Sequence, residues 1–153
     1  MRVAGDGGGL DEARAAAAAA GGDAIDFVGR ITHAEVGRFL AGVDLGYSGQ
    51  RAEPGRQMYH SPLKLAEYMA AGLPVLASRY PDSLAAAAGV AEDLLFEPGS
   101  TGGLELALAW AWQHRADLPA IGMAMRRRAE RRLGWNGRVE VLLSTLRSRG
   151  LLR

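Results

Sequence analysis

The sequence contains no cysteine, and only one of its 18 basic residues is a lysine. Without cysteine, disulfides, thiolate nucleophiles and cysteine-ligated metals are excluded. The three histidines (His33, His60 and His114) are too far apart in the sequence to form a metal-binding motif. No apolar run approaches the roughly 20 residues that a membrane-spanning helix needs. We therefore expect a soluble, cytoplasmic protein without a metal site.

The length and the net charge limit the number of domains and the classes of partner. The chain has 153 residues, which is enough for one hydrophobic core and too few for two, so we expect a single domain over residues 1–153. The formal net charge of +1 gives no indication of nucleic-acid binding. Hydrophobic residues make up 48% of the chain, which is typical of a globular protein.

Short apolar runs alternate with longer helical patterns along the chain. Strands are expected at residues 1–4, 25–28, 43–47, 75–77 and 94–96. Helices are expected at about 10–20, 32–41, 61–71, 81–88, 103–114, 118–132 and 135–149. Such alternation is typical of βαβ units. The sequence therefore predicts an α/β fold: a Rossmann-like parallel sheet of about five strands flanked by helices, with further helices at the C-terminus.

The clearest helix start in the chain is Ser61-Pro62. Serine caps the first free amides of a helix, and proline suits the first helical position. Those amides carry partial positive charge and favour a diphosphate, and Lys64 lies in the same first turn. Glu67 follows one turn later on the same face, where a carboxylate can accept hydrogen bonds from two ribose hydroxyls. The segment therefore predicts a site for a nucleoside diphosphate.

The stretch around this helix resembles the donor site of a known enzyme family. Residues 61–78 read SPLKLAEYMAAGLPVLAS. This stretch looks like the donor site of group 1 (family 4-like) glycosyltransferases. Segments that agree with the family's order are 3–7, 27–31, 41–45, 96–100 and the late Trp135. The resemblance covers nearly the whole chain and identifies it as the C-terminal, donor-binding domain of a GT-B fold.

The resemblance implies a function and a set of site residues. The chain would be the donor-binding part of a retaining glycosyltransferase, which moves a sugar from a nucleoside-diphosphate sugar to a glycan, lipid or other acceptor and requires no cofactor. Glu67 matches the second glutamate of the family's paired-glutamate motif, while Tyr59 stands where the first would lie. No catalytic residue is assigned. The expected donor-binding residues are Glu67, Lys64, Ser61, Pro62, Leu63, Gly5, Gly7, Gly29, Arg30, Ile31, Tyr59 and His60.

The chain also departs from the family. The family's donor domain begins one strand and helix earlier, with an arginine and a lysine that clamp the diphosphate, and it works with an acceptor domain. We expect both parts to be missing from this chain, with Lys64 partly replacing the clamp. The isolated chain is therefore expected to be inactive, to need an acceptor domain or subunit, and to self-associate through an exposed sheet edge.

Other functions compete with this interpretation. A non-catalytic nucleotide-binding module, or one half of a split transferase, would share the same residues. A nucleotide-sugar epimerase would need a catalytic carboxylate pair, which the sequence does not show. The glycine loop at residues 5–9 is equally consistent with a plain turn. A nicotinamide cofactor is disfavoured, because the third glycine of the dinucleotide fingerprint falls at Leu10.

A late helix carries a cluster of five arginines, at positions 126, 127, 128, 131 and 132. A solvated helix face is the ordinary explanation. The sharper hypothesis is peripheral contact with an anionic membrane, at its inner face, where lipid-linked acceptors reside. We expect the three tryptophans, at positions 110, 112 and 135, to be packing residues rather than sugar platforms.

Overall fold

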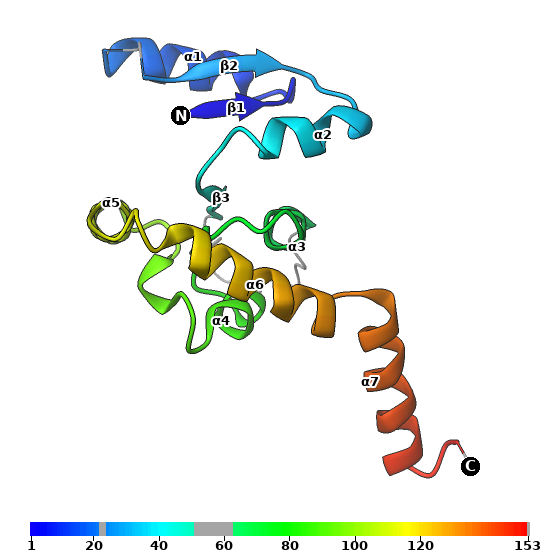
Figure 1. Ribbon diagram of the computed structural model, residues 1–153. Coiled ribbons are helices and arrows are strands. Elements are labelled where there is room, and N and C mark those ends of the chain that lie inside the picture. Colours follow the sequence, from blue (N-terminus) through cyan, green and yellow to red (C-terminus); the bar gives the residue numbers. More distant parts are fainter. Residues whose placement is uncertain (22–23, 51–62, 153) are drawn as a thin grey trace. The chain divides into compact units, whose positions relative to one another are not determined.

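The computed structural model describes residues 1–21, 24–50 and 63–152. Figure 1 shows strands alternating with helices over this part of the chain, and all strand pairs in it are parallel. The predicted α/β, Rossmann-like class is therefore confirmed. Contacts group the chain into two compact units, Met1–Gly42 and Val43–Arg153. The expectation of one domain over residues 1–153 stays a prediction.

The first unit contains two strands and two helices. Its elements are β1 (Arg2–Ala4), α1 (Leu10–Ala19), β2 (Asp26–Gly29) and α2 (His33–Leu40). β1 and β2 pair in parallel, with Val3 opposite Phe27. The Arg2 guanidinium lies 5.1 Å from the centre of the Phe39 ring, which ties α2 to the start of β1. Ala17 and Leu40 are the buried apolar side chains of this unit.

The start of α2 is the capping box that its sequence predicts. The backbone N–H of Thr32 donates to the Glu35 carboxylate at 2.8 Å, and the Thr32 hydroxyl donates to it at 2.7 Å. These two hydrogen bonds lower the pKa of Glu35 below its usual 4.5, the side-chain bond contributing more. The ionised carboxylate therefore stabilises the first turn of the helix.

We expect this contact to be visible in a titration of Glu35 by NMR. The pKa of Glu35 should lie below 4.5 and should return toward 4.5 in Thr32→Ala. Because the pKa is depressed in the folded state, the stabilisation is present above the unfolded pKa and is lost as the pH falls through the folded pKa. Equal pKa values for Glu35 in the two proteins would show that the capping contact does not form in solution.

The second unit contains a three-stranded sheet and most of the helices. Its elements are β3 (Gly46–Ser48), α3 (Leu63–Ala70), β4 (Val75–Ser78), α4 (Pro81–Ala87), the short 3-10 helix η1 (Glu92–Leu94), β5 (Leu95–Phe96), α5 (Thr101–Gln113), α6 (Leu118–Arg132) and α7 (Trp135–Ser148). The strand order is β3-β4-β5, and every residue of the central strand β4 is buried. The predicted five strands thus form one two-stranded and one three-stranded sheet.

The third strand begins later than its apolar pattern indicates. The expected range was 43–47, whereas β3 starts at Gly46, whose partner across the sheet is Val75. The N–H of Gly46 also donates to the Pro74 carbonyl at 2.9 Å. Pairing with β4 defines the start of β3, because Val43 and Leu45 precede the first ladder hydrogen bond even though they are apolar.

The core of the second unit lies between the sheet and helices α3, α4, α5 and α6. Met69, Val75, Leu94 and Met125 are its largest apolar side chains with almost no exposed surface. Helix α6 lies against the turn that follows α3, so closely that a side chain at Gly122 would meet the Gly72 carbonyl oxygen at 2.0 Å. The backbone itself is therefore part of this packing.

The tryptophans differ from the expectation that all three are packing residues. Trp110 packs against the core and stacks on the His114 ring, with 4.2 Å between ring centres. Trp112 and Trp135, by contrast, are 70% and 81% exposed. For these two the prediction was wrong, because a helical pattern identifies apolar residues but does not show whether another element covers them.

Among residues 1–21, 24–50 and 63–152, no helix combines the length and the apolar character required to cross a lipid bilayer.

Candidate functional site

In the first unit, two of the predicted site segments lie together at one sheet edge. β1 and β2 are parallel, so the residues that follow them emerge on the same side. The N–H of Gly5 donates to the Gly29 carbonyl at 2.8 Å, and both glycines have positive φ angles. Arg30 and Asp6 form an exposed ion pair of 3.9 Å. The carboxyl edge of a parallel sheet is where ligands of such folds bind.

The neighbours of this edge shape it. The Gly7 carbonyl accepts a hydrogen bond from the Leu10 N–H at 2.9 Å, which closes the turn that opens α1. Ile31 is half-buried directly after the edge. The exposed Arg30–Asp6 pair contributes little to stability. Its two side chains therefore remain available to a ligand at small cost.

In the second unit, Lys64 and Glu67 extend from the exposed face of α3. Both side chains are exposed, and their spacing of three residues places them one turn apart. Leu65 and Met69 are buried on the opposite side and hold the helix against the core. The exposed Leu63 precedes Lys64 at the start of the helix. The amphipathic pattern of α3 thus directs the predicted ligand-binding pair to solvent.

The packing of α3 on β3 sets the direction of the helix. Tyr68, in the second half of α3, lies so close to Gly46, the first residue of β3, that a side chain at Gly46 would meet the Tyr68 ring at 2.5 Å. Because α3 connects the parallel strands β3 and β4, it runs in the opposite direction to both, and it begins toward the end of β3. Burial raises the pKa of Tyr68, and the negative charge of the adjacent Glu67 raises it further.

Two serines organise the carboxyl end of β4. The buried hydroxyl of Ser78 accepts from the Gln50 N–H at 2.8 Å and donates to the Gln50 carbonyl at 3.0 Å. The Ser83 hydroxyl accepts from the Tyr80 N–H at 2.9 Å and donates to the Ser78 carbonyl at 2.5 Å. Arg79 lies next to this network, and its N–H donates to the Phe96 carbonyl at 2.8 Å.

From the sequence alone, no role was predicted for these serines. The signal that could have identified Ser78 is a small polar residue at the end of an apolar strand. Together with Gln50 they hold the ends of β3 and β4 and the start of α4 in one arrangement. This edge is preorganised by hydrogen bonds that do not depend on a ligand.

Four predicted site residues lie outside the described residues. These are Tyr59, His60, Ser61 and Pro62. Within the part of the chain that the structure describes, no group of three or more histidine, aspartate or glutamate side chains is placed to hold a metal ion.

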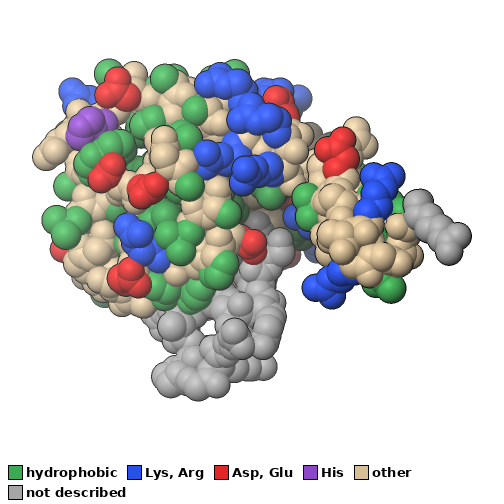
Figure 2. Space-filling model, turned by 90° about the horizontal axis from the view of Figure 1, so that it is seen from below, with side chains coloured by type: hydrophobic (Ala, Val, Ile, Leu, Met, Phe, Trp, Pro, Cys, Tyr) green, Lys and Arg blue, Asp and Glu red, His purple; other side chains and the backbone are tan. Residues whose placement is uncertain are grey.

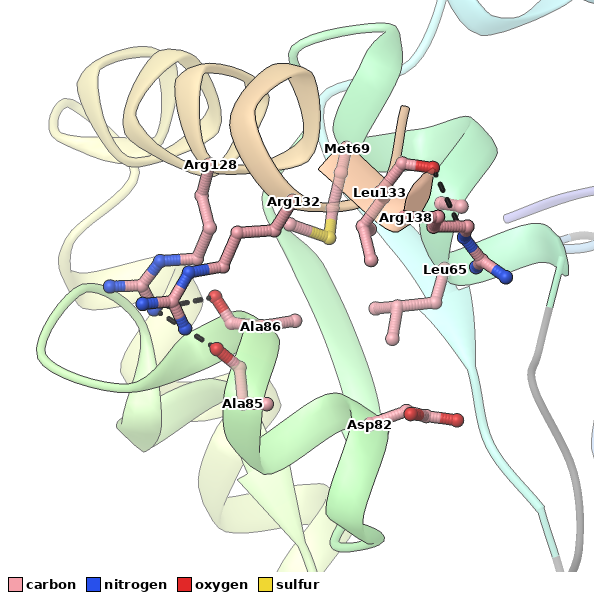
Figure 3. Close-up of a pocket in the computed structure, with 10 residues that line it drawn as sticks. Leu65, Met69, Asp82, Ala85, Ala86, Arg128, Arg132, Leu133 and Arg138 are labelled. Atoms are coloured by element: carbon pink, nitrogen blue, oxygen red, sulfur yellow. Dashed lines mark hydrogen bonds between the residues drawn. The ribbon is translucent and has the colours of Figure 1, made fainter. Parts of the chain in front are cut away.

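A separate pocket lies on the other side of α3, between α3, α4, α6 and the start of α7 (Figure 3). Leu65, Ala66 and Met69 contribute apolar surface to it. Arg128 is held at one end of this pocket, where its Nη1 atom donates to the carbonyls of Ala86 and Ala88 at 3.0 and 2.7 Å. That arginine therefore satisfies the last carbonyls of α4.

Comparison with known proteins gives one family. The model of the family described as glycosyl transferases group 1 matches residues 1–114, which includes every predicted site residue. No curated protein and no solved structure matches the chain.

Proposed function

Because the chain belongs to the group 1 glycosyltransferases, we propose that it is the donor-binding part of a retaining enzyme of the family 4-like type. It would correspond to the C-terminal domain of a GT-B fold. The sugar would pass from a nucleoside diphosphate to a glycan, lipid or other acceptor bound by a separate domain or subunit. No metal or cofactor is required in this proposal.

The observation that supports the proposal is the pairing of Lys64 and Glu67 on the exposed face of α3. The helix begins toward the end of β3, where parallel sheets of this kind bind ligands. The cation suits the phosphate oxygens, and the carboxylate accepts hydrogen bonds from neighbouring ribose hydroxyls. One helical turn therefore offers contacts to both halves of a nucleoside diphosphate.

This arrangement fits the chemistry of glycosyl transfer. When the bond from the anomeric carbon to the diphosphate breaks, positive charge develops on the sugar ring and negative charge on the departing phosphate. We propose that Lys64 stabilises the departing diphosphate, because a fixed cation interacts more strongly with that charge as it grows. Glu67 acts on the ribose, away from the bond that breaks, so its role is binding rather than bond cleavage.

In the first unit, the edge formed by Gly5 and Gly29 is proposed to contribute backbone groups to nucleotide binding. Both positions have positive φ, at 145° and 75°, which favours glycine and keeps the backbone free of side-chain cover. Arg30 and Ile31 follow this edge and would border the base.

A thermal-shift screen tests the proposed function. At a ligand concentration about 100 times Kd, a nucleoside diphosphate should stabilise the protein by about 2.7 kcal/mol, which corresponds to a rise in Tm of roughly 5–10 °C. The Tm shifts given by UDP, GDP, ADP, dTDP and their sugars should differ from one another, because the protein is proposed to recognise one base. The bare nucleosides serve as controls and should give smaller shifts. No shift with any of the four diphosphates would contradict the proposal.

Turnover separates the leading proposal from a non-catalytic binding module. Residues 1–153 alone are expected to bind the preferred donor without transferring its sugar, because the acceptor site is proposed to lie in another domain or subunit. Transfer that appears only when such a partner is added supports the enzyme. Nucleotide binding that never leads to transfer with any partner favours the binding module.

A further inference from the structure

Helix α5 is apolar around almost its whole circumference, yet it is covered on one side only. Over residues 104–112 its single charged residue is Glu105. Two alanines are buried on the side that packs on η1 and β5. On the outer side, Leu108 and Trp112 are 46% and 70% exposed. A helix that is hydrophobic all round is normally buried, so the outer side of α5 has the composition of an interface.

Four exposed residues form a single row along this outer side. Their spacing of three, four and three residues places them on one face of the helix and of the turn that follows it. These residues, which we name the α5 stripe, are Glu105, Leu108, Trp112 and Arg115. The stripe therefore has an acidic end, an apolar centre and a basic end.

The basic end of the stripe is held in place. The Arg115 guanidinium lies over the Trp112 ring, 4.8 Å from its centre, and its Nη1 atom donates to the Trp112 carbonyl at 2.9 Å. The side chain of Arg115 is nevertheless exposed. A guanidinium fixed in this way loses less side-chain freedom when it binds an acceptor. This end of the stripe is therefore preorganised to bind a carboxylate.

A groove of about 620 Å³ lies beside the apolar centre of the stripe. Leu108 and Trp112 line it, together with Leu45, Leu73 and Leu118. Leu45 precedes β3 and Leu73 precedes β4, so the groove lies at the amino ends of these strands. Ligands of such folds bind at the carboxyl ends instead. A partner in the groove would therefore leave the proposed nucleotide site open.

The charges near the stripe are balanced. Residues 101–117 contain one arginine, Arg115, and two acidic residues, Glu105 and Asp117. Among the described residues, Asp44 and Arg115 are the charged ones that line the groove. Nine of the 17 arginines follow residue 125, and Figure 2 shows blue side chains gathered toward the C-terminal helix. A surface with one charge of each sign at opposite ends favours a partner with the same pattern in reverse.

We propose that the α5 stripe binds the α5 stripe of a second copy of this chain, in an antiparallel pair of helices. Positions 105 and 115 are symmetric about position 110, and so are positions 108 and 112. An antiparallel pair centred there brings Glu105 of each copy opposite Arg115 of the other. It also brings each Leu108, which lines the groove, opposite the other Trp112.

The charges select this arrangement over a parallel one. In a parallel pair, Glu105 would face Glu105 and Arg115 would face Arg115, and both like-charge contacts are unfavourable. The antiparallel contact is related by a two-fold axis, so both copies use the same surface and association stops at a dimer. This proposal does not depend on the proposed transferase function, because it involves neither α3 nor the edge at Gly5 and Gly29.

Sedimentation equilibrium of residues 1–153 tests the apolar centre of the stripe. The parent should show a reversible equilibrium between monomer and dimer. Trp112→Ser should raise the Kd of the dimer about 100-fold, roughly 10-fold for each of its two copies in the interface. Trp135→Ser is the matched control, because this tryptophan is 81% exposed on α7. It should dimerise like the parent, and unchanged circular dichroism confirms that each variant is folded.

Charge reversal tests the antiparallel alignment. Glu105→Arg places arginines opposite each other at both ends of the contact, and Arg115→Glu places glutamates there. Each variant alone should raise the Kd about 10-fold, roughly three-fold for each of the two ion pairs that it removes. An equimolar mixture of the two variants regains both pairs of opposite charge, so a heterodimer should form with nearly the affinity of the parent.

Matched reversals on α7 show whether charge alone has an effect. Glu140→Arg and Arg147→Glu change exposed side chains of that helix by the same amounts. Both variants should dimerise like the parent, alone and when mixed.

Three outcomes would overturn the proposal. The first is a parent that stays monomeric at the highest concentration tested. The second is an unchanged Kd in Trp112→Ser, which would assign association to another surface, such as an open sheet edge. The third is a mixture of Glu105→Arg and Arg115→Glu that associates no better than either variant alone, which would show that these two residues do not face each other.

Discussion

Replacing Glu67 with alanine is expected to weaken nucleotide binding by about 1–3 kcal/mol, the scale of lost hydrogen bonds to a charged acceptor. The side chain is exposed on α3, so its removal should leave the fold and the Tm of the unliganded protein unchanged. Isothermal titration calorimetry with the preferred nucleoside diphosphate measures the loss. Glu105→Ala is the matched control, because this glutamate is also exposed on a helix of the same unit.

Lys64→Ala extends the same experiment to the phosphates. The affinity of this variant for the diphosphate should fall more than its affinity for the bare nucleoside. Glu67→Ala should weaken the binding of both ligands, because the nucleoside keeps its ribose. This difference assigns the cation to the phosphates and the carboxylate to the sugar. If the parent and the two variants bind with identical affinities, the nucleotide site does not lie on α3.

The substitution Gly122→Ala should destabilise the protein by about 3 kcal/mol, at the upper end of the usual cost of overpacking. A Cβ atom at this position would meet the Gly72 carbonyl oxygen at 2.0 Å, its carbonyl carbon at 2.9 Å and the Pro74 ring at 3.0 Å. These atoms are backbone and a proline ring, which cannot rotate away. Helix α6 would have to move off the turn after α3, and the buried packing of Met125 would be lost with it.

Chemical denaturation measures this effect against a matched control. Gly102→Ala lies on α5 in open space, so it should leave stability unchanged or raise it by up to about 1 kcal/mol. The urea midpoint of Gly122→Ala should fall well below those of the parent and of Gly102→Ala. Equal midpoints for the two alanine variants would mean that α6 does not pack on this turn in solution.

Much of the fold was predictable because its signals are local. The apolar run at residues 75–77 and the helix after it follow from periodicity and from Pro81 at a helix start. The capping box at Thr32 was also visible in the sequence and forms as predicted. The start of β3 was predicted wrongly, because pairing with Val75 decides it and that partner is 29 residues later in the chain.

The candidate site was predictable in part. The one-turn spacing of Lys64 and Glu67 follows from helical geometry, and the parallel pairing that joins Gly5 to Gly29 follows from the fold class. The serine network at the end of β4 was not predictable, because it depends on Gln50 and Ser78, which are brought together only by the sheet. The exposure of Trp135 was likewise not predictable, because it depends on whether another element packs against α7, and no residue of this helix is buried.

The amino-acid sequence by itself determined the alternation of strands and helices, the family, the basic C-terminal end and the residue types offered to a ligand, since these depend on neighbours a few positions apart. Only the tertiary structure decided which side chains are buried and that α6 packs directly on a backbone turn. It also decided that Arg128 donates to carbonyls at the end of α4, while Arg131 and Arg132 remain exposed. These are properties of contacts between distant segments, and packing rather than local propensity decides them.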